Sequence, residues 1–81
     1  MTSLKGLDFR VAFNVFSEDG KRAADICEFS NGETYIDEKE WVEGTTFENR
    51  HGGSLVGPFK APEEAEKFSV STDWFLGRTR R

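Results

Sequence analysis

Apolar and polar residues alternate almost strictly over residues 7–16. The apolar set is Leu7, Phe9, Val11, Phe13 and Val15, and the residues between them are Asp8, Arg10, Ala12 and Asn14. Successive side chains of a β-strand point to opposite faces, so a period of two is typical of a strand with one buried face. The pattern predicts a strand with this apolar set on its core side.

Two dipeptides predict tight hairpins after this strand, Asp19-Gly20 and Asn31-Gly32. Both are favoured in hairpin loops because their residues tolerate positive φ. With Asp19-Gly20 as a two-residue loop, a second strand over residues 21–29 gives the apolar cross-strand pairs Phe13–Ile26 and Val15–Ala24. Glu28 then falls opposite Val11, so we expect a bulge near Cys27.

The segments after the second turn have weaker strand patterns. We expect strands over residues 33–37, 45–49 and 54–59, with Pro58 at an edge or at a strand end. Residues 38–43 fit either a single helical turn or the end of a strand.

A C-terminal helix is predicted from Pro62 to Gly77. Proline suits a first helical turn, the following glutamates suit the helix dipole, and Gly77 is a natural stop. One face of this helix is predicted to pack on the sheet, with Ala65, Phe68, Thr72, Phe75 and Leu76. The predicted fold class is α+β, an antiparallel β-meander of three to five strands with one C-terminal α-helix packed on one face.

The length of 81 residues predicts a single small domain over residues 1–81. Within it we expect a loose lead-in over residues 1–6 and a basic tail over residues 78–81. An aromatic share of 14% argues against disorder. No apolar run approaches the roughly 18 residues that span a bilayer, and the first ten residues lack an apolar signal core. We therefore expect a cytoplasmic protein that does not bind membranes.

The net charge of −4 is unevenly distributed. Three arginines lie in the last four residues, which leaves 8 basic and 15 acidic side chains over residues 1–77. Between Asp25 and Glu48 there are eight carboxylates and one lysine, Lys39. Such a body repels nucleic acid and is attracted to basic surfaces, including those that normally hold nucleic acid.

The sequence offers little catalytic chemistry. His51 is the sole histidine and Cys27 the sole cysteine, so no thiolate or histidine cluster can hold a metal. A general-base pair of His51 with Glu48 is the one proton-transfer arrangement available, and Cys27 fits a small buried residue. We expect a protein that is not an enzyme, with no cofactor, no metal and no catalytic residue.

Two aromatic residues are candidate partner-binding anchors. Trp41 stands among carboxylates, and the predicted contact set around it is Glu38, Glu40, Trp41 and Glu43. Val70 and Trp74 are i and i+4 on the helix face away from the core and form a second candidate surface. The alternatives are that Trp41 closes the end of the core, and that the helix ends before Trp74, whose ring then folds back or is covered by residues 38–53.

These features favour a small acidic protein-binding module whose partner has a basic surface. In size and charge the chain is similar in type to small phage-encoded inhibitors, anti-CRISPR proteins among them, which implies occlusion of a nucleic-acid-binding surface on a larger host enzyme. One alternative is a single-stranded nucleic-acid-binding protein that uses the open sheet face and the C-terminal arginines. Another is a structural or assembly component that self-associates, for instance as a homodimer.

Overall fold

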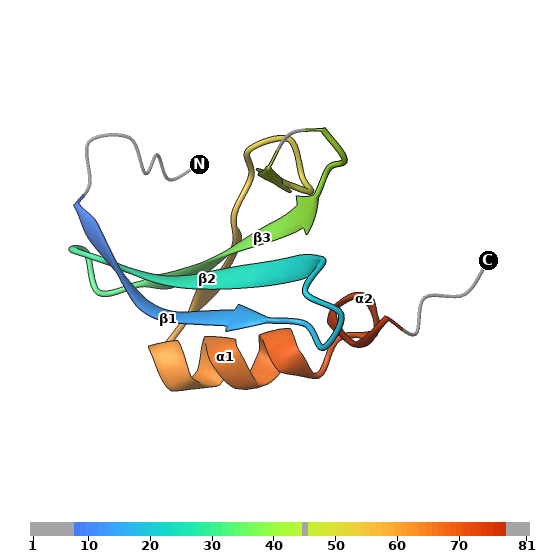
Figure 1. The fold of residues 1–81 in the computed structure, drawn as a ribbon. Coiled ribbons are helices and arrows are strands. Elements are labelled where there is room, and N and C mark those ends of the chain that lie inside the picture. The colour runs from blue at the N-terminus through green and yellow to red at the C-terminus, as the bar shows by residue number, and fades with distance from the viewer. Residues whose placement is uncertain (1–7, 45, 78–81) are drawn as a thin grey trace.

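The computed structural model describes residues 8–44 and 46–77, which form an antiparallel sheet with helices on one face (Figure 1). The predicted α+β architecture is confirmed. The expected lead-in over residues 1–6 and the basic tail over residues 78–81 lie outside the described residues. The elements are β1 (Phe9–Phe16), β2 (Arg22–Phe29), β3 (Thr34–Trp41), β4 (Phe47–Asn49), β5 (Val56–Phe59), α1 (Pro62–Val70) and α2 (Asp73–Leu76).

The first hairpin has the predicted register. Phe13 pairs with Ile26 and Val15 with Ala24, as the apolar pattern indicates. The Ser17 carbonyl accepts a hydrogen bond from the Gly20 amide at 3.0 Å, and the φ of Gly20 is 73°. This positive φ explains why the turn carries glycine.

A β-bulge in β1 divides the strand into two halves whose apolar side chains point to opposite faces of the sheet. Val11 pairs with Cys27, whereas Phe13 pairs with Ile26, so one residue of β1 is extra at this point. A bulge is therefore present, but the prediction of its place near Cys27 is wrong, because the extra residue belongs to β1. Phe29, which a bulge near Cys27 would have turned toward the core under α1, packs instead with Cys27 and Tyr35 on the other face. The prediction of one continuous apolar core face is wrong, because Phe9 and Val11 are 55% and 48% exposed.

The second hairpin has a four-residue connection, residues 30–33. The Gly32 amide donates to the Phe29 carbonyl, and among these residues Gly32 alone has a positive φ, 90°. The Asn31 side chain accepts a hydrogen bond from the Glu33 amide. β3 then continues to Trp41, so residues 38–41 form a strand end and not a helical turn.

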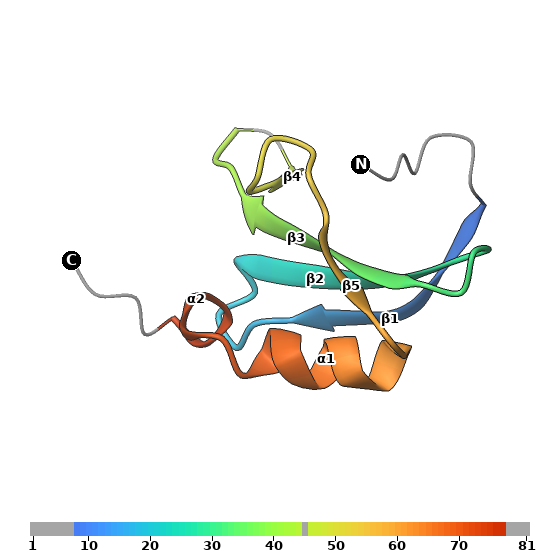
Figure 2. The same cartoon turned by 180° about the vertical axis from the view of Figure 1, so that it is seen from behind.

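β4 and β5 share the second edge of β3. β4 pairs with residues 39–41 and β5 with residues 34–36, so the chain returns along β3 in two short pieces (Figure 2). The Asn49 side chain holds the loop between them by accepting hydrogen bonds from the amides of His51 and Gly53.

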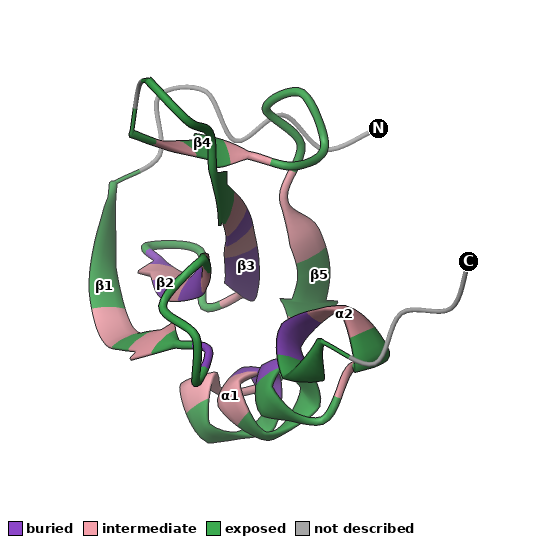
Figure 3. Ribbon diagram, turned by 45° about the vertical axis from the view of Figure 1, so that its right-hand side comes forward, coloured by how far each residue is buried: buried purple, intermediate pink, exposed green. Residues whose placement is uncertain are grey.

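The core lies between α1 and the face of the sheet that it covers. Ala24, Ile26, Ile36 and Ala65 are each 0% exposed. Half-buried apolar residues surround this cluster, namely Phe13, Val15, Val56 and Phe59. In Figure 3 most buried residues accordingly lie on β2, β3 and the helices, while β1 is mostly exposed.

The predicted single helix is divided at residues 71–72, so that part of the helix prediction is wrong. The hydroxyls of Ser71 and Thr72 bond back to carbonyls of the last turn of α1, and Thr72 Oγ1 also accepts from the Phe75 amide. Such side chains compete with the helical backbone and favour a cap. Of the predicted core face, Ala65 and Phe75 are buried, but Phe68 and Leu76 are 43% and 44% exposed.

Ile26 and Ile36 are fully buried at the centre of the core, so truncating either should lower the free energy of unfolding strongly. We expect Ile36→Ala to lower the free energy of unfolding by about 2–5 kcal/mol, because it leaves a cavity in a fully buried site. Phe68→Ala, on the exposed side of α1, should cost about 1–2 kcal/mol. Urea unfolding of the two variants measures both values. Equal losses would contradict this core.

Candidate functional site

The sheet face opposite α1 is covered by no helix in the described part of the chain (Figures 1 and 2). The bulge and the register place Phe9, Val11, Asn14 and Phe16 of β1 on this open face. On the neighbouring strands, the residues paired with these positions point to the same face. The open face therefore has a polar centre between two aromatic clusters.

The polar centre is a row of side chains that satisfy one another. Lys39 Nζ lies 3.0 Å from an Asp25 oxygen and 3.7 Å from an Asp37 oxygen. Asn14 donates to Asp25, and Asn49 Nδ2 donates to Asp37 Oδ1 at 2.8 Å. The hydrogen bond to Asp25, with the charges of both aspartates, raises the pKa of Lys39. The row is therefore a structural network that fixes register across four strands.

The first aromatic cluster lies at the start of β1. The ring centroids of Phe9 and Phe29 are 5.1 Å apart, and those of Phe29 and Tyr35 are 5.5 Å apart. Cys27 is buried beside them, as predicted for a small apolar residue. Burial, with the charges of Asp25 and Asp37, raises the pKa of its thiol from 9.0 to about 11. A thiol in this state is a poor nucleophile.

The second aromatic cluster lies at the other end of the open face. Phe47 packs edge-on against both Trp41 and Phe16, with centroid distances of 5.7 Å and 5.8 Å. Trp41 is 47% exposed and Phe16 is 54% exposed. Trp41 therefore lies on the surface and does not close the end of the core.

The β3–β4 hairpin has an acidic side opposite its aromatic side. Glu40 pairs with Glu48 across the two strands, one position from the pair of Trp41 with Phe47. Both glutamates are exposed, as is Glu43 in the connecting turn. Like charges directly opposite each other destabilise a strand pair, so this arrangement costs folding energy.

Glu38 lies on the covered side of β3 and is 4% exposed. Its Oε1 lies 3.2 Å from Arg50 Nη1 and 2.7 Å from His51 Nε2. The partner of His51 is thus Glu38 and not Glu48. A carboxylate held this way is structural and is not available to a partner protein.

Trp74 joins the same network from α2. Its ring lies under the Arg50 guanidinium, 4.4 Å from ring centroid to Cζ, and its Nε1 donates to Glu40 Oε1 at 3.0 Å. Trp74 is half-buried, because α1 ends before it and the loop after β4 covers it. Val70 is 38% exposed at the end of α1, and the break at residues 71–72 removes the predicted i, i+4 pairing with Trp74.

Sequence reasoning missed Phe16, Phe47 and Glu48 as members of the surface around Trp41. The position of Gly44 between two segments of the sequence could have indicated these neighbours. A turn centred on Gly44 pairs Trp41 with Phe47 and Glu40 with Glu48, as observed. We name this surface, formed by Phe16, Glu40, Trp41, Glu43, Phe47 and Glu48, the hairpin surface.

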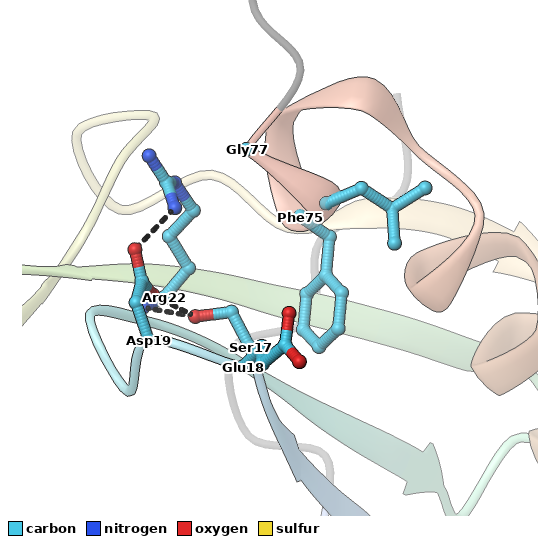
Figure 4. Close-up of a pocket in the computed structure, with 7 residues that line it drawn as sticks. Ser17, Glu18, Asp19, Arg22, Phe75 and Gly77 are labelled. Carbon is cyan, nitrogen blue, oxygen red and sulfur yellow. Dashed lines mark hydrogen bonds and ion pairs between the residues drawn. The ribbon is translucent and has the colours of Figure 1, made fainter.

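A cavity of about 310 Å³ lies between the first turn and α2 (Figure 4). Arg22 and Asp19 form an ion pair of 3.1 Å in its wall, and Ser17 bonds to both of them. Phe75 forms the opposite wall. Ser17, Asp19 and Arg22 are paired with one another, and Glu18 is the other charged side chain of the lining, so the cavity shows no convergent set of free donors and acceptors.

The arginines of β1 and β2 do not supply the open face with the positive charge that nucleic-acid binding would need. Arg10 pairs with Glu28 at 2.6 Å, and both lie at positions of the covered side. Arg22 is held by Asp19, and the open face carries Asp25 and Asp37 at its centre. The C-terminal arginines lie outside the described residues.

Comparisons with known proteins give no family for this chain, since no family model, curated protein or solved structure matches it. Within residues 8–44 and 46–77, no group of three or more histidine, cysteine, aspartate or glutamate side chains is arranged to hold a metal ion. No helix of the same residues is long and apolar enough to cross a membrane.

The buried carboxylate of Glu38 anchors the loop after β4. We expect Glu38→Ala to lower the free energy of unfolding by about 1–3 kcal/mol, because Arg50 and His51 lose their common partner. Glu48→Ala, the exposed control on β4, should change it by less than about 0.5 kcal/mol or raise it slightly. Thermal or urea unfolding distinguishes the two. If the two variants unfold alike, Glu38 does not hold the loop.

Proposed function

We propose that this protein is a non-catalytic binding module that docks through the hairpin surface on a basic surface of another protein. The partner surface is of the kind that otherwise holds nucleic acid, so binding would occlude it. The observation that carries the proposal is the composition of the β3–β4 hairpin, which has an exposed aromatic pair on one side and a like-charged glutamate pair on the other.

Trp41 has the properties of an interface anchor. Tryptophan is enriched among residues that dominate binding energy, and this ring is 47% exposed yet supported by Phe47 from behind. A ring that is already packed on one side loses little conformational entropy when a partner covers the other side.

The glutamates supply the negative charge of the hairpin surface. Glu40 and Glu48 face each other, and Lys39 is held on the opposite side of β3 by Asp25 and Asp37. Arg22, the neighbour of Glu40 on β2, forms its ion pair with Asp19, so neither basic side chain forms an ion pair with these glutamates. A basic partner would relieve the repulsion between the two glutamates on binding, and the attraction would weaken with added salt.

The proposal omits three residues of the sequence-based set. Glu38 is engaged inside the fold, Trp74 is covered by Arg50, and Val70 lies on α1 away from the hairpin. Glu40, Trp41 and Glu43 are retained.

Neutralising the hairpin glutamates should affect binding and folding in opposite directions. We expect the triple variant Glu40→Gln, Glu43→Gln, Glu48→Gln to bind its partner about tenfold more weakly, because three steering charges are lost. Its stability should stay constant or rise by up to about 1 kcal/mol, because the Glu40–Glu48 repulsion disappears. Capture from source-cell lysate with nuclease, in a salt series, measures binding; thermal unfolding measures stability.

A matched triple variant on α1 controls for net charge. Glu63→Gln, Glu64→Gln, Glu66→Gln removes the same charge from the first turns of the helix. We expect this control to retain the captured protein. Equal capture by both triple variants, or capture that disappears after nuclease treatment, would refute the proposed function.

A further inference from the structure

The two edges of the sheet differ in how well they are protected. The edge beyond β3 is formed by β4 and β5, which have three and four residues, and β5 contains Pro58. Short strands and proline are common devices that prevent edge pairing. The opposite edge is β1, with eight residues, one charge and no second neighbour among the described strands. That charge, Arg10, is paired with Glu28. The bulge of β1, which is also a device that can deter edge pairing, lies at the centre of the strand.

The hydrogen bonds at the two ends of β1 show which backbone groups point away from β2. The Asp8 carbonyl accepts from the Ser30 amide, and the Ser17 amide donates to the Arg22 carbonyl. Backbone groups alternate in direction along an antiparallel strand. Following this alternation from each end of β1 toward its middle gives the residues whose backbone N–H and C=O groups point away from β2. They are Phe9, Val11, Asn14 and Phe16.

These four residues form a self-complementary set. Their spacing is two, three and two residues, so it reads the same in both directions about a point between Ala12 and Phe13. A second β1 laid antiparallel about that point places Phe9 opposite Phe16 and Val11 opposite Asn14. Each of these four residues lies on the open face, so opposed side chains share a face, as an antiparallel ladder requires.

We propose that two copies of this chain pair β1 to β1 in this antiparallel register and form a two-fold symmetric dimer with one continuous sheet. The interface is isologous and uses the long free edge of both copies. The assembly therefore stops at a dimer and does not extend into a fibre. No like charges meet, because Arg10 faces Val15 of the second copy. The proposal shares Phe16 with the hairpin surface but does not rest on the function proposed for that surface.

The ring contacts favour a second copy over a foreign strand. Phe9 and Phe16 are 55% and 54% exposed, and each already packs on a ring of its own chain, Phe29 and Phe47 respectively. Pairing them across the interface joins the first aromatic cluster of one copy to the second cluster of the other. Aromatic cross-strand pairs stabilise antiparallel sheets. Because the dimer is two-fold symmetric, the Phe9–Phe16 contact occurs twice.

A charge exchange at Phe9 and Phe16 tests both the dimer and its register. The double variant Phe9→Lys, Phe16→Lys places like charges opposite each other twice, whereas Phe9→Glu, Phe16→Lys places opposite charges there. The two variants change the same exposed positions and differ in the sign of one charge. Sedimentation over a concentration series should give a dimer for the unaltered chain. The dissociation constant of the Lys/Lys variant should exceed that of the Glu/Lys variant by about tenfold or more.

Two outcomes would overturn the proposal. One is a monomeric unaltered chain at every concentration that stays soluble, and the other is equal dissociation of the two double variants. Amide hydrogen exchange of the unaltered chain gives a readout that needs no variant. The outward amides of Phe9, Val11, Asn14 and Phe16 should become protected as concentration rises, and exchange that is independent of concentration would also overturn the dimer.

Discussion

The bulge between Val11 and Phe13 is the constraint on which the rest of this structure depends. It lets one strand supply two faces: Phe13 and Val15 pack under α1, while Phe9 and Val11 join the open face. The core is therefore small and is centred on Ile26 and Ile36 of the inner strands. The open face gains the exposed Phe9 ring, which a regular strand would have placed on the covered face, and this ring pairs with Phe16 in the dimer proposed above.

Glu38 and Glu40 are two residues apart on β3 and share its covered side, so they differ by their position along the strand and not by the face they occupy. Glu38 points to the covered side and is enclosed by Arg50 and His51, whereas Glu40 lies at the strand end, where it meets Glu48 and the Trp74 indole. The buried carboxylate holds the loop after β4, and repulsion within the exposed pair is expected to weaken the pairing of β3 with β4. The exposed pair beside Trp41 is the feature on which the function proposed above rests.

The sequence pattern predicted the features of the fold that depend on residues close together in the chain. The first hairpin register follows from Asp19-Gly20 and the apolar pairs beside it, and the start of the helix at Pro62 follows from the residue types there. The side of the sheet taken by Phe9 could not be predicted, because alternation looks the same with or without one extra residue. The placements of Glu38 and Trp74 depend on a loop distant in sequence, and the helix break depends on the Ser71 and Thr72 hydroxyls.

The cross-strand contacts of β1 test the bulge most directly. Residues opposite each other in non-hydrogen-bonded pairs bring their Hα atoms close enough for strong nuclear Overhauser effects. With the bulge, these contacts join Val11 to Cys27 and Phe9 to Phe29. Without it, the register at the turn would extend unchanged and join Ala12 to Cys27 and Arg10 to Phe29. The account predicts the first set in the nuclear magnetic resonance spectrum, and the second set would contradict it.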